Sequence, residues 1–227
     1  MINRYSRQIM RDVWSDQSKY AIWFEIEMLA HEAMESIGLI EKGLTKKIRD
    51  KLKDIIFDEA RISEIESKTH HDVIAFLTFI SEKIGEKQAR YLHQGMTSSD
   101  ILDTCLCIQL KKASQHIRED IDALLKELLK KAEEYKYLPT IGRSHGIHAE
   151  PTTVGLKFAQ AYAEFDRALK RMEIAEKEIS ICALSGSVGT FANIDPRIEK
   201  YVAKKLNLNI ETISTQIIPR DRYAYFF

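Results

Sequence analysis

The sequence contains little glycine and proline, with nine Gly and four Pro among 227 residues. A turn-rich β protein uses many such residues, so their scarcity favours long helices. No apolar stretch reaches the ~18 residues that a transmembrane helix requires. Arg4 and Arg7 near the start are not followed by the apolar core of a signal peptide. We therefore expect a cytoplasmic protein without membrane contact.

An excess of one charge and a set of paired cysteines are also missing. Lys+Arg and Asp+Glu both number 34, so the formal net charge is zero, and nothing in the overall charge indicates a nucleic-acid partner. Any anionic ligand must then be held by local cations. Cys105, Cys107 and Cys182 are odd in number and widely spaced, which does not make a disulfide framework. We interpret them as small buried hydrophobic residues.

Residues 1–96 are predicted to form a small helical domain. Ser15-Asp16 can cap a helix that runs to about Ile37, because apolar residues recur after it at helical spacing. A second helix is expected after Gly43, and a third from near Thr69 to Gly85.

Residues 97–227 differ in character and are predicted to be part of a domain of long helices. From Ser98 to Tyr135 there is neither Gly nor Pro, which predicts a helix of roughly 55 Å with one apolar seam. A polar connector, 140–150, leads to a second long helix over about 152–183, and shorter helices are expected at 195–206 and from Arg220. Two long helices cannot close a bundle. We therefore expect an all-α fragment, or a core that other copies complete.

Three short polar clusters interrupt these helices and contain five of the seven histidines. Histidine is the side chain best suited to proton transfer near neutral pH. The clusters are Lys68-Thr69-His70-His71-Asp72, His93-Gln94-Gly95-Met96-Thr97-Ser98-Ser99-Asp100, and the connector from Gly142 to Pro151 with Arg143, His145 and His148.

Each cluster also has a purely structural interpretation. Small hydroxyl and carboxylate side chains before an apolar helix are most often N-caps, and this applies to Thr69, Asp72, Thr97, Ser98 and Ser99. His145 and His148 are three residues apart, as zinc ligands can be, but no cysteine accompanies them, so no metal is expected. His31 and His116 are interpreted as ordinary helix residues.

The functional interpretation starts from the helix expected at Ser98. Its free N–H groups and positive dipole end, with the hydroxyls of Thr97 and Ser98, form a site for a carboxylate or a phosphate. Arg143 lies two residues from His145, so a fixed cation stands near a proton-transfer group. An anion site, a cation and several histidines are what an elimination beside a carboxylate requires.

Taken together and in order, these segments resemble the adenylosuccinate lyase family of the fumarase/aspartase superfamily. Each motif alone is weak, but their joint occurrence is specific. They are Arg4-Tyr5-Ser6-Arg7, Thr69-His70-His71-Asp72-Val73, Gly95-Met96-Thr97-Ser98-Ser99-Asp100, the stretch from Gly142 to Thr153, the stretch from Ser185 to Asn193, Ser214-Thr215-Gln216 and Arg220-Asp221-Arg222.

The resemblance implies a fold and an activity. The family has a small helical N-terminal domain and long central helices that four subunits pack into a shared bundle, and each active site draws residues from three subunits. Its members catalyse β-elimination of fumarate from adenylosuccinate, giving AMP, and from the succinyl-carboxamide ribotide intermediate of purine biosynthesis, giving AICAR. No cofactor is implied.

The resemblance also assigns roles to residues. His145 would donate a proton to the departing nitrogen, and His71 would assist it. Substrate contacts would come from Arg4, Tyr5, His70, Asp72, Thr97, Ser98 and Gln216. Further possible contributors are His93, Arg143 and Arg220.

Two features depart from the family pattern. Position 70 is often Arg and is His here, which removes a permanent cation. The signature loop, Ser-Ser followed by Met-Pro-x-Lys-x-Asn-Pro, does not occur, although it carries the serine base, so we expect the 227-residue chain alone to be inactive. The alternatives are a non-catalytic helical assembly module and a sister enzyme such as argininosuccinate lyase. Thr-x-His-Asp-Val and His-Ala-Glu-Pro-Thr-Thr favour adenylosuccinate lyase over its sisters.

Overall fold

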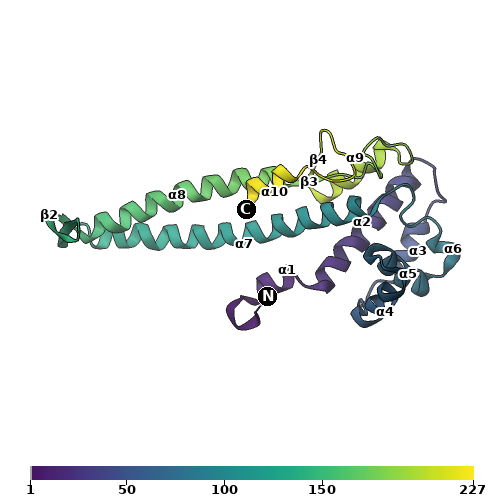
Figure 1. Cartoon of the computed structure of the whole chain (residues 1–227), viewed down its shortest axis with the longest axis horizontal. Helices are drawn as coiled ribbons and strands as arrows, with labels where there is room; N and C mark the ends of the chain where they lie inside the picture. The colour runs from purple at the N-terminus through teal and green to yellow at the C-terminus, as the bar shows by residue number, and fades with distance from the viewer. Residues whose placement is uncertain (1) are drawn as a thin grey trace. The chain divides into compact units, whose positions relative to one another are not determined.

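The computed structural model describes residues 2–227, which divide into two compact units (Figure 1). Unit 1 comprises residues up to 111, residues 179–225 and residue 227, and unit 2 comprises residues 112–178 and 226. The helices are η1 (Asn3–Tyr5), α1 (Gln8–Val13), α2 (Asp16–Ser36), α3 (Leu44–Lys51), α4 (Glu59–Thr69), α5 (Asp72–Ile84), α6 (Glu86–Ala89), α7 (Ser98–Glu134), α8 (Val154–Ile179), α9 (Pro196–Leu206) and α10 (Arg220–Phe226).

Within residues 2–227, the strands form two small sheets. β1 (Pro139–Ser144) pairs antiparallel with β2 (Ile147–Thr153), and β3 (Ile181–Cys182) pairs parallel with β4 (Asn209–Ile210). The expected all-α class is therefore confirmed. None of the helices within residues 2–227 combines the length and the apolarity needed to cross a bilayer.

An aromatic cluster forms the centre of the N-terminal part of unit 1. Tyr20 and Trp23 of α2 contact Phe76 of α5 with ring centroids 5.7 and 5.4 Å away. Phe57, which precedes α4, lies 6.0 Å from the same ring. Gln17 fixes this segment, since its Nε2 donates to the Phe57 carbonyl at 2.6 Å and its Oε1 accepts from the Phe57 N–H at 3.1 Å.

The rest of unit 1 packs against α2 and the first part of α7. α9 lies along α2, where the Tyr201 hydroxyl donates to Glu32 at 3.1 Å. The apolar side chains of Ile101 and Cys105 on α7 belong to the same core as Cys182, which lies directly after α8. All three cysteines are free and buried, as expected from the sequence.

Unit 2 consists of residues 112–134 of α7, the β1–β2 hairpin and most of α8. The two helices run antiparallel (Figure 1), and Arg118 of α7 donates to Glu176 of α8 at 3.1 Å. At the hairpin end, the rings of Tyr135 and Phe158 stack with centroids 6.1 Å apart. Gly155 allows the chains to approach closely, because a Cβ there would lie 2.5 Å from the Ala132 carbonyl oxygen.

Several expected elements are confirmed at their boundaries. Ser15 caps α2, where its hydroxyl accepts from the Ser18 N–H at 3.1 Å. α7 covers the predicted stretch almost to the residue, and Asp195 caps α9 as its position before Pro196 indicates. The two compact units do not test the domain boundary predicted at residue 96, which stays a prediction.

Two expectations for local structure were wrong. The helix expected from near Thr69 begins at Asp72, because Thr69 is the last residue of a preceding helix, α4, that was not predicted from the sequence. The polar connector is a β-hairpin, so the second long helix begins at Val154 and not at 152. Hydroxyl, imidazole and carboxylate side chains marked both places as polar, but the pairing of the strands depends on partners across the turn.

A buried histidine gives the fold a pH dependence. His31 of α2 is 0% exposed, and neither ring nitrogen has a hydrogen-bond partner among the described residues. Burial lowers the pKa of His31, and the carboxylates of Glu27 and Glu35 with the backbone of Tyr91 offset only part of this effect. The ring therefore stays neutral inside unit 1.

We predict that His31→Leu stabilises the protein, most strongly below pH 6.5. The unfolded chain protonates this histidine near pH 6.5, and the lowered pKa means that the folded chain does so only at lower pH, so wild-type stability falls as the pH decreases through 6.5. Removing an unpaired buried polar group should add about 1 kcal/mol at neutral pH. Urea unfolding at pH 5.5 and 7.5 measures both effects, and an unchanged difference between the two pH values would contradict the burial of a neutral ring.

Candidate active site

The start of α7 is joined to a glycine-containing loop of unit 1 by one carboxylate. Asp100 is 2% exposed. Its Oδ2 accepts from the N–H groups of Thr97 and Gly186 at 2.9 and 3.1 Å, and its Oδ1 accepts from the Ser185 N–H at 3.1 Å. The helix N-terminus with Thr97 and Ser98 is thereby held beside the Ser185–Gly189 loop.

Backbone segments around this carboxylate approach so closely that only glycine fits. A Cβ at Gly95 would lie 2.0 Å from the Asn193 carbonyl oxygen, and one at Gly189 would lie 2.3 Å from that of Ser214. The hydroxyls of Ser185 and Ser214 are hydrogen-bonded at 2.6 Å. The structure therefore brings three candidate segments together: the Thr97-Ser98 helix start, the Ser185–Gly189 loop and the stretch that leads to Gln216.

A second buried carboxylate supports the same loop. Glu199 of α9 is 4% exposed, and its Oε2 accepts from the Leu184 N–H at 2.9 Å. Three consecutive N–H groups, of residues 184–186, are thus held by Glu199 and Asp100. Burial raises the pKa of Glu199 to about 7, and the charges of Asp100 and Glu211 add to this, while the Leu184 hydrogen bond opposes it. Burial also raises the pKa of Asp100, against the effect of its three N–H donors.

The cluster at residues 68–72 is a junction between two helices. His70 ends α4 in the left-handed conformation, with φ 51°. His71 caps α5, since its Nδ1 accepts from the Ile74 N–H at 3.4 Å, and Asp72 accepts from its neighbour Val73 at 2.7 Å. The capping interpretation considered for Thr69 and Asp72 therefore applies to His71, and its Nε2 remains open to other contacts.

Arg143 and His145 belong to unit 2, whereas the other candidates belong to unit 1. The turn of the hairpin is His145-Gly146, with φ 52° and 75°, which is the two-residue geometry favoured between antiparallel strands. Arg143 lies opposite His148 in the strand register. All three of these residues are exposed, and His145 stands at the tip of the hairpin.

The remaining candidates lie at the surface of unit 1. Arg4 and Tyr5 form the turn η1, where the guanidinium lies 4.6 Å from the ring centroid. Gln216 is exposed. Arg220 donates to Asp103 of α7 at 2.9 Å, and Asp103 also accepts from the Ile218 N–H at 2.9 Å, so this cation holds the segment before α10.

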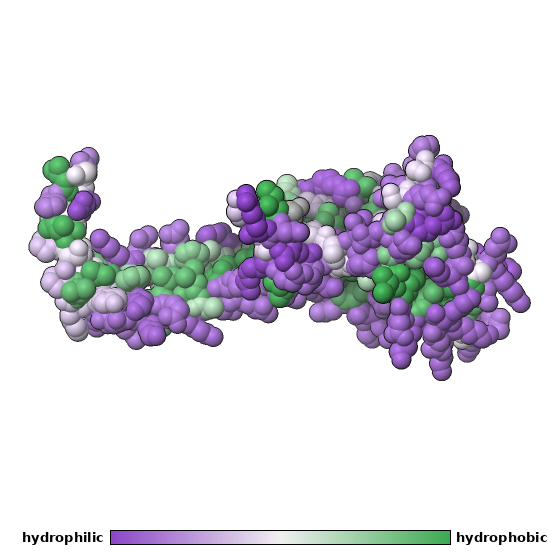
Figure 2. Space-filling model, turned by 90° about the horizontal axis from the view of Figure 1, so that it is seen from below, coloured by the Kyte–Doolittle hydropathy of each residue, from purple (hydrophilic) through white to green (hydrophobic). Residues whose placement is uncertain are grey.

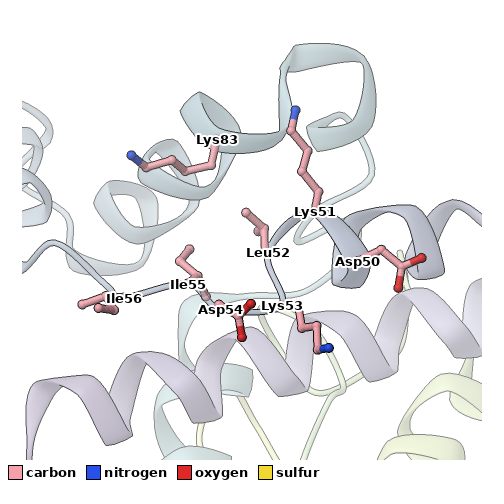
Figure 3. Close-up of a pocket in the computed structure, with 8 residues that line it drawn as sticks. All are labelled: Asp50, Lys51, Leu52, Lys53, Asp54, Ile55, Ile56 and Lys83. Carbon is pink, nitrogen blue, oxygen red and sulfur yellow. The ribbon is translucent and has the colours of Figure 1, made fainter.

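The structure contains a pocket that none of these candidates line. It has a volume of about 370 Å³ and lies around Leu52 and Ile55 (Figure 3). Its three lysines, Lys51, Lys53 and Lys83, point in different directions in Figure 3, so their charges do not converge on one point. Within residues 2–227, no group of three or more His, Cys, Asp or Glu side chains is arranged to hold a metal ion.

Comparison with known proteins identifies the family. Residues 3–227 match a protein family described as lyase. The chain belongs to this lyase family. It is 46% identical over 226 residues to the adenylosuccinate lyase of Staphylococcus saprophyticus, and 46% identical over 227 residues to that of Streptococcus mutans. Each match covers 100% of this chain and 52% of the relative, so the chain spans about half the length of these curated relatives.

Solved structures show that this half has the lyase fold. A fumarate lyase from Mesorhizobium sp. BNC1 superposes with a TM-score of 0.88 at 27% identity, covering 97% of this chain and 53% of the other. A 3-carboxy-cis,cis-muconate lactonizing enzyme from Pseudomonas putida superposes with a TM-score of 0.89 at 24% identity, covering 98% and 52%, which shows the fold alone.

Neither buried carboxylate of this lyase chain is among the site residues predicted from the sequence. Asp100 could have been found, since it stands three residues after Thr97, where a capping-box acid is expected. Glu199 also left a signal, because it lies between Ile198 and Val202 on the apolar face of α9. Neither signal identifies the backbone N–H groups that donate to the carboxylate oxygens of Asp100 and Glu199.

We predict that Glu199→Gln alters how stability depends on pH. The folded protein binds a proton at Glu199 up to about pH 7, and the unfolded chain releases it near 4.5, so wild-type stability decreases as the pH rises between these values. The glutamine stays neutral and can still accept from Leu184. Relative to wild type, the variant should be more stable at pH 8 than at pH 5 by about 1–3 kcal/mol. Urea unfolding at both pH values tests this, and parallel stability curves would refute a raised pKa.

Proposed function

We propose that this chain forms the N-terminal half of an adenylosuccinate lyase. The observation that supports this proposal is the 46% identity to two adenylosuccinate lyases over the full length of the chain. The reaction would be β-elimination of fumarate from adenylosuccinate and from the succinyl-carboxamide ribotide, within purine and AMP biosynthesis. The enzyme would act in the cytoplasm without a cofactor.

The start of α7 is the proposed site for the succinyl carboxylate. Its N–H groups and the hydroxyls of Thr97 and Ser98 can donate to an anion. Asp100 binds the Thr97 N–H from inside, so the hydroxyls are not needed to hold the helix start. This arrangement supports a binding role for the hydroxyls beside the capping role of Asp100.

His145 is proposed as the acid that protonates the departing nitrogen. A β-elimination needs one group to remove the proton from carbon and another to protonate the leaving atom. The hairpin supports this role, because its turn presents the imidazole without burying it. His71, whose Nδ1 accepts from its own helix, would assist with Nε2, and Arg4, Tyr5, His70, Asp72 and Gln216 would bind the nucleotide part.

The proposed assembly is a homotetramer with active sites shared between subunits. The long helices support it by exposing large apolar side chains along their surface (Figure 2), which otherwise remain in water. Within unit 2 these are Leu124, Leu129, Leu156 and Ile174, with exposures between 38% and 61%.

The test is to express the full-length protein in a host that lacks adenylosuccinate lyase. The purified protein should convert adenylosuccinate to AMP and fumarate, and release fumarate from the succinyl-carboxamide ribotide. Release of fumarate from argininosuccinate instead would favour the sister enzyme. Assembly without release from any of the three would favour a non-catalytic module.

His145→Ala in the full-length protein should lower kcat by about 10²–10⁴-fold, the usual contribution of a general acid. Substrate affinity should change little, because the imidazole acts on the leaving atom. His148→Ala, on the same hairpin, is the matched control and should retain turnover. Steady-state kinetics measure both variants, and turnover within threefold of wild type for His145→Ala would remove this residue from the mechanism.

Thr97→Val combined with Ser98→Ala should weaken substrate binding. Hydrogen bonds to a charged group contribute about 1.5–3 kcal/mol each. The thermal stability should change little, because the Asp100 bond to the Thr97 N–H remains. Ser99→Ala is the matched control in the same turn. Ligand titration and calorimetry on the same preparation separate the two roles, and a lower Tm with unchanged affinity would show that the hydroxyls only cap the helix.

A further inference from the structure

Glu27 of α2 is a buried carboxylate that binds a single distant residue twice. It is 1% exposed and stands 66 positions before His93. Its Oε2 accepts from the His93 backbone N–H at 2.9 Å, and its Oε1 lies 2.9 Å from the ring Nδ1. A peptide N–H can only donate, so the carboxylate acts as an acceptor for it.

His93 adopts an unfavourable backbone conformation to make both contacts. Its φ is 60°, in the left-handed region that residues with a Cβ rarely occupy. Such conformations persist where the surroundings fix them, and they concentrate at functional sites. Two hydrogen bonds to one buried carboxylate provide that restraint.

The contact with Glu27 determines which ring nitrogen of His93 gains or loses a proton. An ionised Glu27 requires a donor at Oε1, so Nδ1 of His93 keeps its proton in both the neutral and the charged ring. The proton that is gained or lost is therefore at Nε2. This atom makes no hydrogen bond to any of residues 2–227, and the side chain is 20% exposed.

His93 stands next to the proposed carboxylate site. A turn in which the Met96 N–H donates to the His93 carbonyl at 3.2 Å leads directly to Thr97 and Ser98. Burial raises the pKa of Asp100, and His93 is one of the groups that oppose this effect.

We propose that Glu27 is a positioning residue that holds His93 as the Nδ1–H tautomer, so that Nε2 exchanges a proton with an N–H or O–H group of the substrate. In this step the proton leaves the substrate atom for the Nε2 lone pair and returns along the same hydrogen bond, while Glu27 stays ionised. The titratable groups that face this pair are His31 on α2, which interacts with Glu27, and Asp100 on α7, which interacts with His93. The inference rests on the proposed function for the identity of the substrate.

The tautomer can be measured directly in the full-length protein. Solid-state NMR of ¹⁵N-histidine-labelled protein, with His93→Gln to assign the signals, should show a protonated Nδ1 and an unprotonated Nε2 at pH 8. In Glu27→Gln the single amide oxygen cannot accept from both the backbone N–H and the Nδ1–H of His93. The amide NH2 group then favours an unprotonated Nδ1, so the Nε2–H tautomer should become populated. A wild-type His93 with its proton on Nε2 at pH 8 would overturn the inference, whether or not Glu27→Gln folds.

Kinetics separate positioning from a purely structural role. Glu27→Gln should lower kcat at least about tenfold, with KM within threefold. The double variant with His93→Gln should be no slower than His93→Gln alone, because Glu27 acts through that ring. The matched control is Glu25→Gln on the same helix, which pairs with Arg49 and should leave kcat unchanged. Additive losses in the double variant would overturn the proposal.

The inference and the proposed function can fail separately. If the wild-type protein does not act on adenylosuccinate, the proposed function fails, and the NMR measurement still decides the tautomer of His93. If it acts on adenylosuccinate and Glu27→Gln keeps wild-type kcat, the function stands and the role of Glu27 is refuted.

Discussion

Asp100 binds three backbone N–H groups, that of Thr97 and those of Ser185 and Gly186, which follow Asp100 by 85 and 86 residues in the sequence. A buried carboxylate is stable only when hydrogen bonds replace its lost hydration, so this residue requires the helix start and the Ser185–Gly186 backbone to stay together. Asp100 therefore links Thr97 and Ser98 to the loop, which Glu199 also holds at residue 184.

Buried carboxylates accept from backbone N–H groups at other places in unit 1. Glu199 binds the N–H of residue 184, Asp103 binds that of residue 218, and Glu27 binds that of residue 93. In each case a helix supplies the acid and an irregular segment supplies the N–H. Irregular segments have backbone donors that no helix or strand pairs, so buried acids satisfy these donors and fix the loop at once. These loops also carry the residues that the resemblance assigns to the substrate.

Three histidines, one from each polar cluster, have a left-handed backbone: His70, His93 and His145. Each stands at a junction, between two helices, before a long helix or at a hairpin tip. The N–H groups of His70 and His93 are hydrogen-bonded to Glu66 and Glu27, and Gly146 follows His145 in the turn. This backbone conformation fixes the direction of each Cα–Cβ bond, and in His93 the ring itself is held by Glu27.

The sequence by itself determined the helical class, the bounds of α7, the caps of α2 and α9 and the polar clusters, because periodicity, caps and the lack of Gly and Pro are local properties. It also indicated the family, through motifs whose order is specific. Only the tertiary structure decided that the connector is a hairpin, that His71 caps α5, and which N–H groups Asp100, Glu199 and Glu27 bind. Those outcomes depend on hydrogen-bond partners far apart in the chain, and the choice of partner is made by packing, which no local pattern encodes.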